Sequence, residues 1–592
     1  MKKVRKEKFS VISRILGYAL KHKSCFIPGM ALVIIGTALS LLAPVLTGMA
    51  IDSAVEGGTD FSVIARYCVI IAACVAISGI SVWTGNILLS RLSFLTVRDI
   101  RRELFDKLLS LPLSRIERHS RGDLMTRMTA FGENLSDGLY QGIMQLSAGL
   151  VTLLMTIVCM YVMNWAVATL VVLLTPVSAF VSAAIAKRNR VTFAKQSVNM
   201  EKMSGLAEEH LSGTRVLRSY GRVEESEEQF AKINRELFKS GLSSQFAGAL
   251  VNPVSRIVNN IIYAVVAIVG GVFIIGSDPG GWASNIGAGL TLGGLSAFLA
   301  YANQFAKPFN DVTSVTAELQ TAASAARRIF ELTDQADEDK GGTMSVAHPV
   351  SGIEFRDASF SYSDKPFMEH ITFAAKQGQK IALVGTTGSG KTTIINLIMR
   401  FYDITGGRLI FDGNDIENYP REGVRRAFGM VLQDTWLFNG SIEENIRYGK
   451  LDATHEDVVE AAKAAYVHRF VQTLPGGYDM VLNEEASNVS QGQKQLLTIA
   501  RAILADPKIL ILDEATSSVD TRTEVRIQKA MDNLMQGRTS FIIAHRLSTI
   551  RDADLILVMK DGDIIEQGSH EELLAKNGFY AELYNSQFEK SA

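Results

Sequence analysis

One stretch of eight residues has the composition and spacing of a phosphate-binding loop. It consists of Gly385, Thr386, Thr387, Gly388, Ser389, Gly390, Lys391 and Thr392. An apolar run (381–384) precedes it and a helical-looking run (393–400) follows it. Glycines let the backbone approach a phosphate closely, and successive N–H groups at a helix N-terminus then face the anion. The context of strand, glycine loop and helix therefore predicts a nucleotide phosphate site.

Two side chains of this stretch would act on the nucleotide. Lys391 would place its charge against the β- and γ-phosphates, and the Thr392 hydroxyl can ligate Mg²⁺. Thr393, the next residue, is included among the predicted nucleotide-binding residues. The alternative is a glycine-rich turn that binds nothing, but the complete motif in this context favours nucleotide binding.

A second nucleotide signal follows about 120 residues later. The apolar run 509–512 predicts a buried strand, and Asp513 and Glu514 stand at its carboxyl end, where open α/β sheets bind ligands. Asp513 would hold Mg²⁺ through water, and Glu514 would polarise the attacking water as a general base. An Asp-Glu pair after an apolar strand is a weak signal alone, and its distance from the P-loop makes it a strong one.

The composition indicates a membrane protein with a soluble domain. The chain has 592 residues, is 47% hydrophobic and 20% charged, and carries a net charge of -1, which gives no indication of nucleic-acid binding. The long apolar segments lie in the first half. The four cysteines have no metal-like spacing, so we interpret them as small buried apolar residues rather than disulfides: Cys25, Cys68, Cys74 and Cys159.

Six apolar stretches are long enough to cross a bilayer, at about twenty residues or more each. They are 25–51, 62–90, 139–163, 166–187, 246–276 and 286–310. Lysine and arginine are concentrated before the first stretch, after the second and after the fourth, which places both termini in the cytoplasm. The amphipathic segment 9–20 predicts an interfacial helix along the inner membrane surface.

Two cytoplasmic segments, 96–134 and 192–245, show helical spacing of apolar residues and predict membrane helices that continue into the cytosol. Breaks around 129–134 and 219–224 are expected to hold short cross-helices. A soluble helical insert that contacts nothing else is the alternative. A polar domain is expected after the linker 334–352.

Polar residues on the fifth stretch share one helical face: Asn252, Arg256, Asn259 and Asn260. They could line a translocation pathway, because polar residues at membrane depth usually face a cavity or a partner helix. They could equally lie near the inner interface, where polarity costs little. Asn303, Gln304 and Lys307 on the sixth stretch are ambiguous in the same way.

With both nucleotide motifs and six apolar stretches, the chain resembles the ATP-binding cassette exporters over nearly its whole length. The resemblance implies a membrane α-helical domain with six transmembrane helices (1–333), a linker (334–352) and an α/β P-loop nucleotide-binding domain (353–592). In that family, cross-helices transmit closure of the cassettes to the membrane helices. The cofactors implied are ATP and Mg²⁺.

The resemblance also assigns roles outside the two motifs. Tyr362 would stack on adenine, Gln433 would sense Mg²⁺ and the membrane domain, and His545 would contact the γ-phosphate. Residues 518–520 match the loop that crosses the dimer interface. The alternatives are an ordinary strand aromatic for Tyr362 and a structural histidine for His545, and the spacing of His545 from Glu514 favours the functional role.

The signature segment departs from the family pattern Leu-Ser-Gly-Gly-Gln, because it reads Val-Ser-Gln-Gly-Gln. Ser490, Gly492 and Gln493 match the pattern and would contact the γ-phosphate held by the opposite cassette. Gln491 places a side chain where the family has glycine, which would alter that contact. This combination resembles the catalytic half of a bacterial heterodimeric exporter, and a homodimer that tolerates Gln491 is the alternative.

The expected function is ATP-driven export of amphipathic small molecules or drugs across a bacterial cytoplasmic membrane. The expected partners are a second half-transporter, membrane lipid and the cargo. A lipid or peptide exporter, an importer on the exporter fold, and a nucleotide-gated protein that does not pump remain alternatives. Glu514 and His545 argue against the last of these.

Overall fold

A computed structural model describes residues 2–56, 61–276, 283, 289–346, 352–363, 365–433, 435–483, 488–513, 520–544 and 547–588. The chain divides into two compact units. The helical unit comprises Met1–Leu109 and His119–Gln335, and the α/β unit comprises Ser110–Arg118 and Ala336–Ala592.

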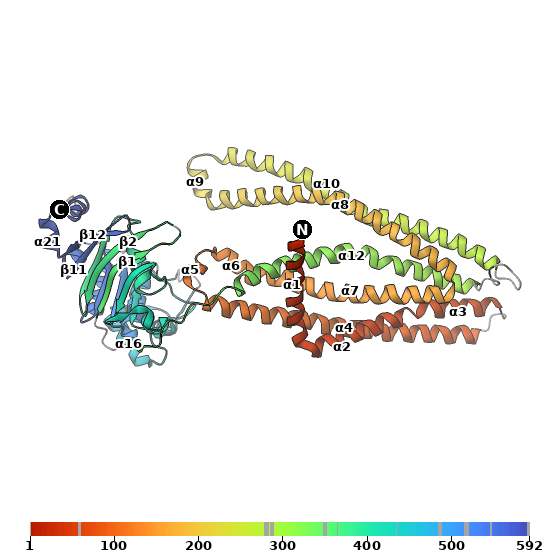
Figure 1. Cartoon of the computed structure of the whole chain (residues 1–592), viewed down its shortest axis with the longest axis horizontal. Coiled ribbons are helices and arrows are strands. Elements are labelled where there is room, and N and C mark those ends of the chain that lie inside the picture. Colours follow the sequence, from red (N-terminus) through yellow and green to blue (C-terminus); the bar gives the residue numbers. More distant parts are fainter. Residues whose placement is uncertain are drawn as a thin grey trace. The chain divides into compact units, whose positions relative to one another are not determined.

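Long helices make up the helical unit (Figure 1). Each predicted membrane stretch lies in one of them, as far as the described residues reach, and the first stretch is divided between α2 and α3. In chain order they are α1 (Lys2–Ala19), η1 (Leu20–His22), α2 (Lys23–Ser40), α3 (Ala43–Glu56), α4 (Phe61–Ser110), α6 (Arg121–Met128), α7 (Ala130–Met163), α8 (Trp165–Ser212), α9 (Thr214–Ser219), α10 (Val223–Ile275) and α12 (Leu292–Thr333).

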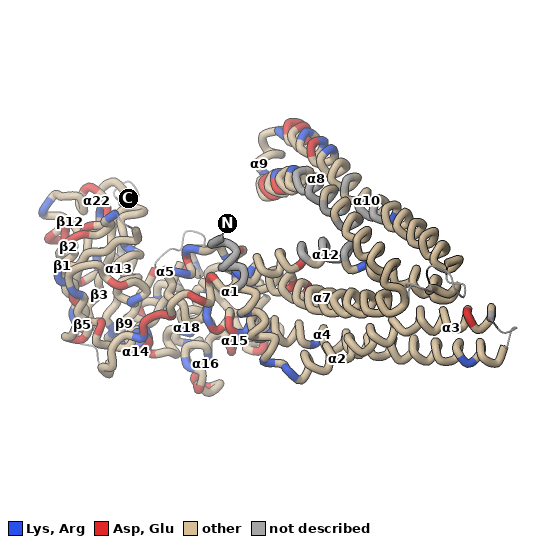
Figure 2. The backbone as a smooth tube through the Cα atoms, turned by 45° about the vertical axis from the view of Figure 1, so that its right-hand side comes forward, with Lys and Arg blue, Asp and Glu red and all other residues tan. Residues whose placement is uncertain are grey.

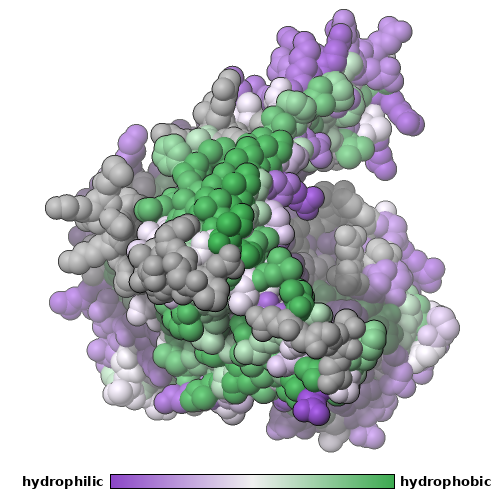
Figure 3. All heavy atoms as spheres, turned by 90° about the vertical axis from the view of Figure 1, so that its right-hand side faces the viewer, coloured by the Kyte–Doolittle hydropathy of each residue, from purple (hydrophilic) through white to green (hydrophobic). Residues whose placement is uncertain are grey.

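Among the described residues, four segments are long and apolar enough to cross a membrane: Val11–Val55, Phe61–Ser110, Arg121–Met163 and Arg256–Ile275. A shorter apolar helix spans Trp165–Val177. Large apolar side chains lie exposed on these helices, and Figure 3 shows a continuous hydrophobic area on one face of the molecule. Such a surface is stable against lipid rather than water. In Figure 2, charged residues gather on α8 and α10 near α9, whereas the opposite portions of these helices carry few.

Small residues allow close packing between two of these helices. α12 packs along α7, and Gly138 and Gly142 of α7 face Ala322 and Leu319 of α12. A Cβ atom on Gly138 would lie 2.3 Å from the Cβ of Ala322. Close approach of helix backbones through small residues is a common means of helix association in membranes.

The cysteines are all free, as predicted. Their predicted burial is wrong for Cys68, which is exposed on α4 in the middle of an apolar surface. A small apolar side chain is equally stable facing lipid, so apolarity did not indicate burial here.

The first predicted break does not hold a cross-helix in the structure. The short helix α5 lies at Leu113–Ile116, and residue 129 is only a single-residue turn between α6 and α7. The prediction of a cross-helix around 129–134 is therefore wrong. Pro112 precedes α5, and a proline disfavours helical conformation at the residue before it, which ends α4 there. The second predicted break is present, but the short helix lies before it: α9 spans Thr214–Ser219, and α10 begins at Val223.

The α/β unit contains a six-stranded sheet of order β12-β11-β3-β10-β9-β6 and a four-stranded antiparallel sheet of order β2-β1-β4-β5. The strands are β1 (Gly352–Phe360), β2 (Met368–Lys376), β3 (Lys380–Gly385), β4 (Gly406–Phe411), β5 (Asn414–Asp415), β6 (Phe428–Val431), β7 (Gly440–Ser441), β8 (Val481–Leu482), β9 (Ile509–Asp513), β10 (Thr539–Ile543), β11 (Leu555–Lys560) and β12 (Asp563–Gly568). The strands predicted at 381–384 and 509–512 are confirmed by β3 and β9.

Helices accompany these strands: α5, α13 (Lys391–Ile398), η2 (Ile416–Asn418), α14 (Arg421–Arg426), α15 (Ile442–Arg447), α16 (His455–Ala464), α17 (His468–Thr473), η3 (Gly477–Asp479), α18 (Gln491–Ala505), α19 (Thr521–Met535), α20 (Leu547–Arg551), α21 (His570–Ala575) and α22 (Phe579–Phe588). The interior residues of β3 and β9 are fully buried, which is typical of parallel strands covered on both faces.

The sheet order brings the two nucleotide motifs to one edge. β10 lies between β3 and β9 and is parallel to both, with Ile543 in register with Leu383 on one side and Asp513 on the other. β6 is parallel to β9 on its far side. The carboxyl ends of β3, β10, β9 and β6 therefore meet at the same edge, which is the ligand-binding edge of such sheets.

Candidate nucleotide-binding site

The loop between β3 and α13 has the backbone of a phosphate cradle. Gly388 and Gly390 have φ values of +84° and +103°, a region that glycine enters at no steric cost. A Cβ on Gly390 would lie 2.6 Å from Cε of Met368. The predicted glycines at these positions are thus required by the path of the chain as well as by the approach of an anion.

Lys391 lies at the start of α13, and its side chain folds back over the loop. Its Nζ donates hydrogen bonds to the carbonyl oxygens of Gly385 (2.8 Å) and Thr386 (2.9 Å). Burial lowers the pKa of Lys391, and the nearby Asp513 carboxylate acts in the opposite direction. The hydroxyl of Ser389 is buried and has no hydrogen-bond partner within the described residues. A buried lysine ammonium beside an unsatisfied hydroxyl fits the triphosphate of ATP.

The three predicted Mg²⁺ ligands belong to neighbouring strand ends. Thr392 is exposed at the start of α13, Asp513 ends β9, and Gln433 follows β6 by two residues. Among the described residues, no group of three or more His, Cys, Asp or Glu side chains is placed to hold a metal ion. Mg²⁺ usually takes one or two protein ligands and completes its shell with water and phosphates, so this set fits Mg²⁺ bound together with a nucleotide.

Tyr362 follows β1 and presents an aromatic surface near the P-loop helix. Its hydroxyl is hydrogen-bonded to Oγ1 of Thr393 (2.9 Å), and its ring meets Phe360 edge to face at 4.7 Å. The side chain is still 46% exposed. Tyr362 is therefore fixed at its hydroxyl end and leaves room for a base to stack. The sequence prediction missed Tyr402, which contacts the same ring at 5.2 Å.

The signature residues cap a helix in this chain. Ser490 is the N-cap of α18: its Oγ accepts from the backbone N of Gln493 (3.4 Å), and its own backbone N donates to Oε1 of Gln493 (2.8 Å). Gly492 is buried in the first turn. Within the described residues, no hydrogen bond or ion pair joins these residues to the P-loop. The arrangement leaves the α18 N-terminus, with its partial positive charge, available to an anion from another chain.

Gln491 has a contact that the sequence did not predict. Its Nε2 donates to Oγ1 of Thr435 at 3.4 Å, and Thr435 lies two residues after Gln433. The non-glycine side chain thus links the signature helix to the segment that carries a predicted Mg²⁺ ligand.

Replacing Gln491 with glycine is expected to raise the ATPase rate of self-associated chains about two- to tenfold, because in the dimer that the resemblance implies the side chain would no longer stand between the partner's phosphate and the helix N-terminus. Thr435→Val removes the hydrogen bond but leaves the bulk of Gln491, so it serves as the matched variant. An unchanged rate for Gln491→Gly in a steady-state ATPase assay would show that the altered signature is tolerated as it stands.

Several predicted residues lie outside the described part of the chain. They are the predicted catalytic residues Glu514 and His545 and the predicted interface residues 518–519. Their described neighbours Asp513 and Ala544 lie at the ends of the adjacent strands β9 and β10, where Ala544 N donates to the Leu383 carbonyl (3.2 Å). Asp520 caps α19 by accepting from Thr523 N (3.0 Å).

A small cavity of about 50 Å³ lies among the apolar helices of the helical unit. Its lining includes Asn259 and Asn260 of α10, Asn303 of α12 and Thr175 of α8, a residue that the sequence prediction missed. Oδ1 of Asn259 is buried and has no partner among the described residues. Arg256, by contrast, is exposed, and the side chain of Asn252 lies outside the described residues. The structure therefore brings together polar residues of three helices.

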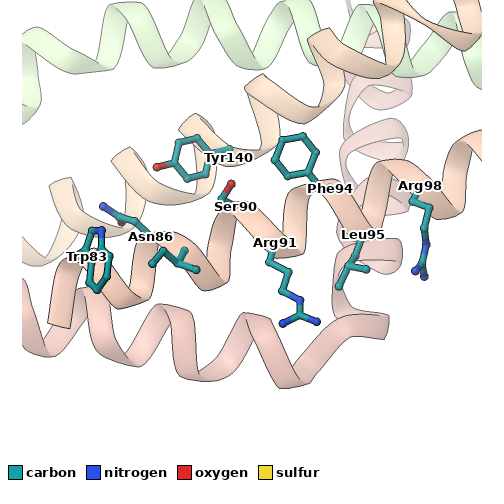
Figure 4. Close-up of a pocket in the computed structure, with 9 residues that line it drawn as sticks. Trp83, Asn86, Ser90, Arg91, Phe94, Leu95, Arg98 and Tyr140 are labelled. Carbon is teal, nitrogen blue, oxygen red and sulfur yellow. The ribbon is translucent and has the colours of Figure 1, made fainter. Parts of the chain in front are cut away.

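A second cavity, of about 820 Å³, lies against α4 (Figure 4). Ser90 and Phe94 point toward Tyr140 of α7, while Arg91 and Arg98 point away from it. Trp83 also lines the cavity and is exposed. Aromatic residues next to arginines are typical of a membrane–water interface.

Two family models match the chain in succession. The first, described as ABC transporter transmembrane region, matches residues 26–309, and the second, described as ABC transporter, matches residues 368–517. The matches cover the apolar helices and the nucleotide motifs respectively.

Similar proteins share both parts. The uncharacterized ABC transporter ATP-binding protein YfiC of Bacillus subtilis is 40% identical over 99% of this chain and 95% of its own length. The fatty acid ABC transporter ATP-binding/permease protein of Mycobacterium bovis is 38% identical over 91% of this chain and 84% of its own length. The ATP-dependent lipid A-core flippase of Syntrophus aciditrophicus is 32% identical over 99% of this chain and 96% of its own length.

A solved structure shares the fold along nearly the whole chain. It is that of a bacterial Atm1-family ABC exporter with ATP bound, with a TM-score of 0.79 and 28% sequence identity. The alignment covers 96% of this chain and 99% of that structure.

Proposed function

Because the chain belongs to the ABC transporter family, as an exporter half-transporter whose ATPase is coupled to transport, we propose that it exports amphipathic small molecules and drugs as half of a heterodimer. ABC exporters function as dimers, and this chain carries one transmembrane region and one ATP-binding domain. The single observation that carries the heterodimer is a P-loop side with Lys391 and Asp513 in place beside a signature in which Gln491 replaces glycine.

The membrane cavities support an amphipathic cargo. Asn259, Asn260 and Asn303 form a polar site within helices whose outer surfaces are apolar. Such a site can hydrogen-bond the polar group of a molecule whose remaining surface stays in contact with apolar side chains. Unpaired polar groups at membrane depth are costly, so a ligand that satisfies Asn259 would be favoured there.

The distribution of aromatic and basic residues supports the topology. The chain is a multi-pass membrane protein, and we place it in a bacterial cytoplasmic membrane with both termini in the cytoplasm. Trp83, Arg91 and Arg98 would mark the point at which α4 leaves the inner face of the bilayer. The Lys and Arg residues of the segments assigned to the cytoplasm would hold those segments on the inner side of the membrane, in agreement with the positive-inside rule.

The α/β unit would bind Mg²⁺-ATP with its own residues and hydrolyse it in a site shared with the partner. ATP supplies the phosphoanhydride bond whose hydrolysis resets the transporter. Lys391 would balance the phosphate charge and Tyr362 would orient the base. Glu514 would take a proton from the attacking water, and His545 would hold the γ-phosphate. Closure of two cassettes on bound nucleotide would then bias the membrane helices between two states.

A lipid is a second candidate cargo. The named relatives include a fatty acid transporter and a lipid A-core flippase, and lipids are themselves amphipathic. The same nucleotide site would drive either cargo, so the two candidates differ only in what enters the membrane unit.

The test is an ATPase assay of the chain in lipid vesicles, alone and together with candidate partner half-transporters. We expect little activity alone and full activity with a partner that has an unaltered signature. Full activity of a stable self-dimer would contradict the heterodimer. Stimulation by a fluorescent drug, compared with a fluorescent phospholipid, would identify the cargo class. Cargo flux that continues when hydrolysis is blocked with ATP still bound would contradict a pump.

A further inference from the structure

The segment Ser110–Arg118 is attached to the α/β unit, although it directly continues the membrane helix α4. At its start, Ser110 Oγ donates to Oδ1 of Asp337 (2.6 Å), and the backbone N of Glu338 donates to the Ser110 carbonyl (2.8 Å). These bonds fix one end of the segment.

The other end of the segment is held by a tyrosine. Glu117, the C-cap of α5, accepts a hydrogen bond through Oε2 from the hydroxyl of Tyr402. Burial and the bond to Glu117 raise the pKa of Tyr402, although Arg118 opposes this, so the hydroxyl remains a donor. A hydroxyl that donates to a carboxylate makes a stronger bond than one between two neutral groups.

The ring of Tyr402 lies directly against the aromatic residue proposed to stack on adenine. Tyr402 meets Tyr362 edge to face at 5.2 Å with an interplanar angle of 81°, and it meets Phe360 at 5.6 Å. Tyr362 is thus bounded by Phe360, Tyr402 and the Thr393 hydroxyl. A continuous series of contacts runs from Glu117 to Tyr362.

We propose that Glu117 and Tyr402 are positioning residues for the nucleotide base, and that purine binding at Tyr362 strengthens the attachment of Ser110–Arg118 to the α/β unit. The proposal rests on the nucleotide site proposed above. If the attached segment orients the Tyr362 ring for stacking, then by linkage a stacked base must favour the attached segment by the same factor. The segment that continues a membrane helix would then respond to the base as well as to the phosphates.

The test compares two conservative variants, Tyr402→Phe and Glu117→Gln, in the full-length dimer. Each removes the charged hydrogen bond while keeping the shape of the side chain. We expect the KM for ATP to rise about two- to tenfold with kcat unchanged, which is the loss associated with one aromatic contact. The KM for UTP, whose smaller base stacks less, should change less than about twofold. The double variant should be no worse than either single variant.

Two further variants separate the possible failures. Tyr478→Phe removes another half-buried tyrosine hydroxyl, bonded to His468 at 2.8 Å, and should leave KM unchanged. Tyr362→Ala tests the base site itself. If Tyr362→Ala raises KM but Tyr402→Phe and Glu117→Gln do not, the positioning role of Glu117 and Tyr402 is wrong, whereas the base site at Tyr362 is supported. If Tyr362→Ala leaves KM unchanged, the assigned base site is wrong. A fall in kcat with unchanged KM would indicate a structural role only and would overturn the proposal.

Discussion

Replacement of Glu514 by glutamine is expected to lower the ATPase rate by roughly 10²- to 10⁴-fold while ATP still binds. Glutamine keeps the size of the side chain but cannot accept a proton from the attacking water. Lys391 and Tyr362, which would hold the phosphates and the base, are untouched by the change. Steady-state ATPase measurements combined with equilibrium ATP binding, on protein in lipid, would separate the two effects.

A surface glutamate provides the control for this variant. Glu571 lies exposed in α21, so Glu571→Gln changes the charge by the same amount and should leave the rate unchanged. An ATPase rate within about threefold of the wild type for Glu514→Gln would rule out Glu514 as the base, because a positioned general base contributes at least about 10²-fold.

Replacement of Lys391 by alanine is expected to lower kcat/KM for ATP by roughly 10²- to 10³-fold, the usual loss when a preorganised donor to developing charge is removed. The Lys391 ammonium is held over the P-loop by the carbonyls of Gly385 and Thr386, so alanine would remove the positive charge from a site already shaped for it. Kinetics over a range of ATP concentrations would measure the loss. A change smaller than about tenfold would contradict the assigned role.

The pH dependence of ATP binding provides an independent check on Lys391. Since burial lowers the pKa of Lys391 from its ordinary value of 10.5, the site loses its charge at a lower pH than an exposed lysine would. ATP affinity should therefore fall as pH rises toward that lowered pKa, and binding there should take up protons. Calorimetry in buffers of different ionisation enthalpy would measure this uptake. In Lys391→Arg the decline should vanish, because a guanidinium does not titrate in this range.

The lowered pKa of Lys391 also determines the direction in which folding stability changes with pH. Between the lowered pKa of Lys391 and 10.5, the unfolded chain binds more protons than the folded chain. The contribution of Lys391 to the free energy of unfolding therefore rises with pH in that window.

The nucleotide site was predictable where it depends on short-range patterns. The glycines, Lys391 and the strand ending at Asp513 are each defined by a few consecutive residues, and the parallel sheet then brings the strand ends together. The short helix α5 was missed because its main signal is a single residue, Pro112, within a long helical pattern.

Contacts between distant segments were not predictable. Tyr402 and Glu117 are 285 residues apart, and Gln491 and Thr435 are 56 residues apart. No periodicity or local motif connects such pairs, since their contact depends on the packing of the whole unit. The same holds for Thr175, which joins Asn259 and Asn303 only because three helices meet.

The N-terminus of α18 explains why serine suits position 490 better than aspartate does. Aspartate and asparagine cap helices as well as serine does, because capping requires only an oxygen that accepts from a backbone N–H. A hydroxyl, however, can accept and donate: the oxygen of Ser490 accepts from Gln493, and its O–H can donate to another group. Ser490 can therefore cap α18 and, in the proposed dimer, donate a hydrogen bond to a phosphate held by the partner. Aspartate would also cap the helix, but its negative charge would repel the phosphate.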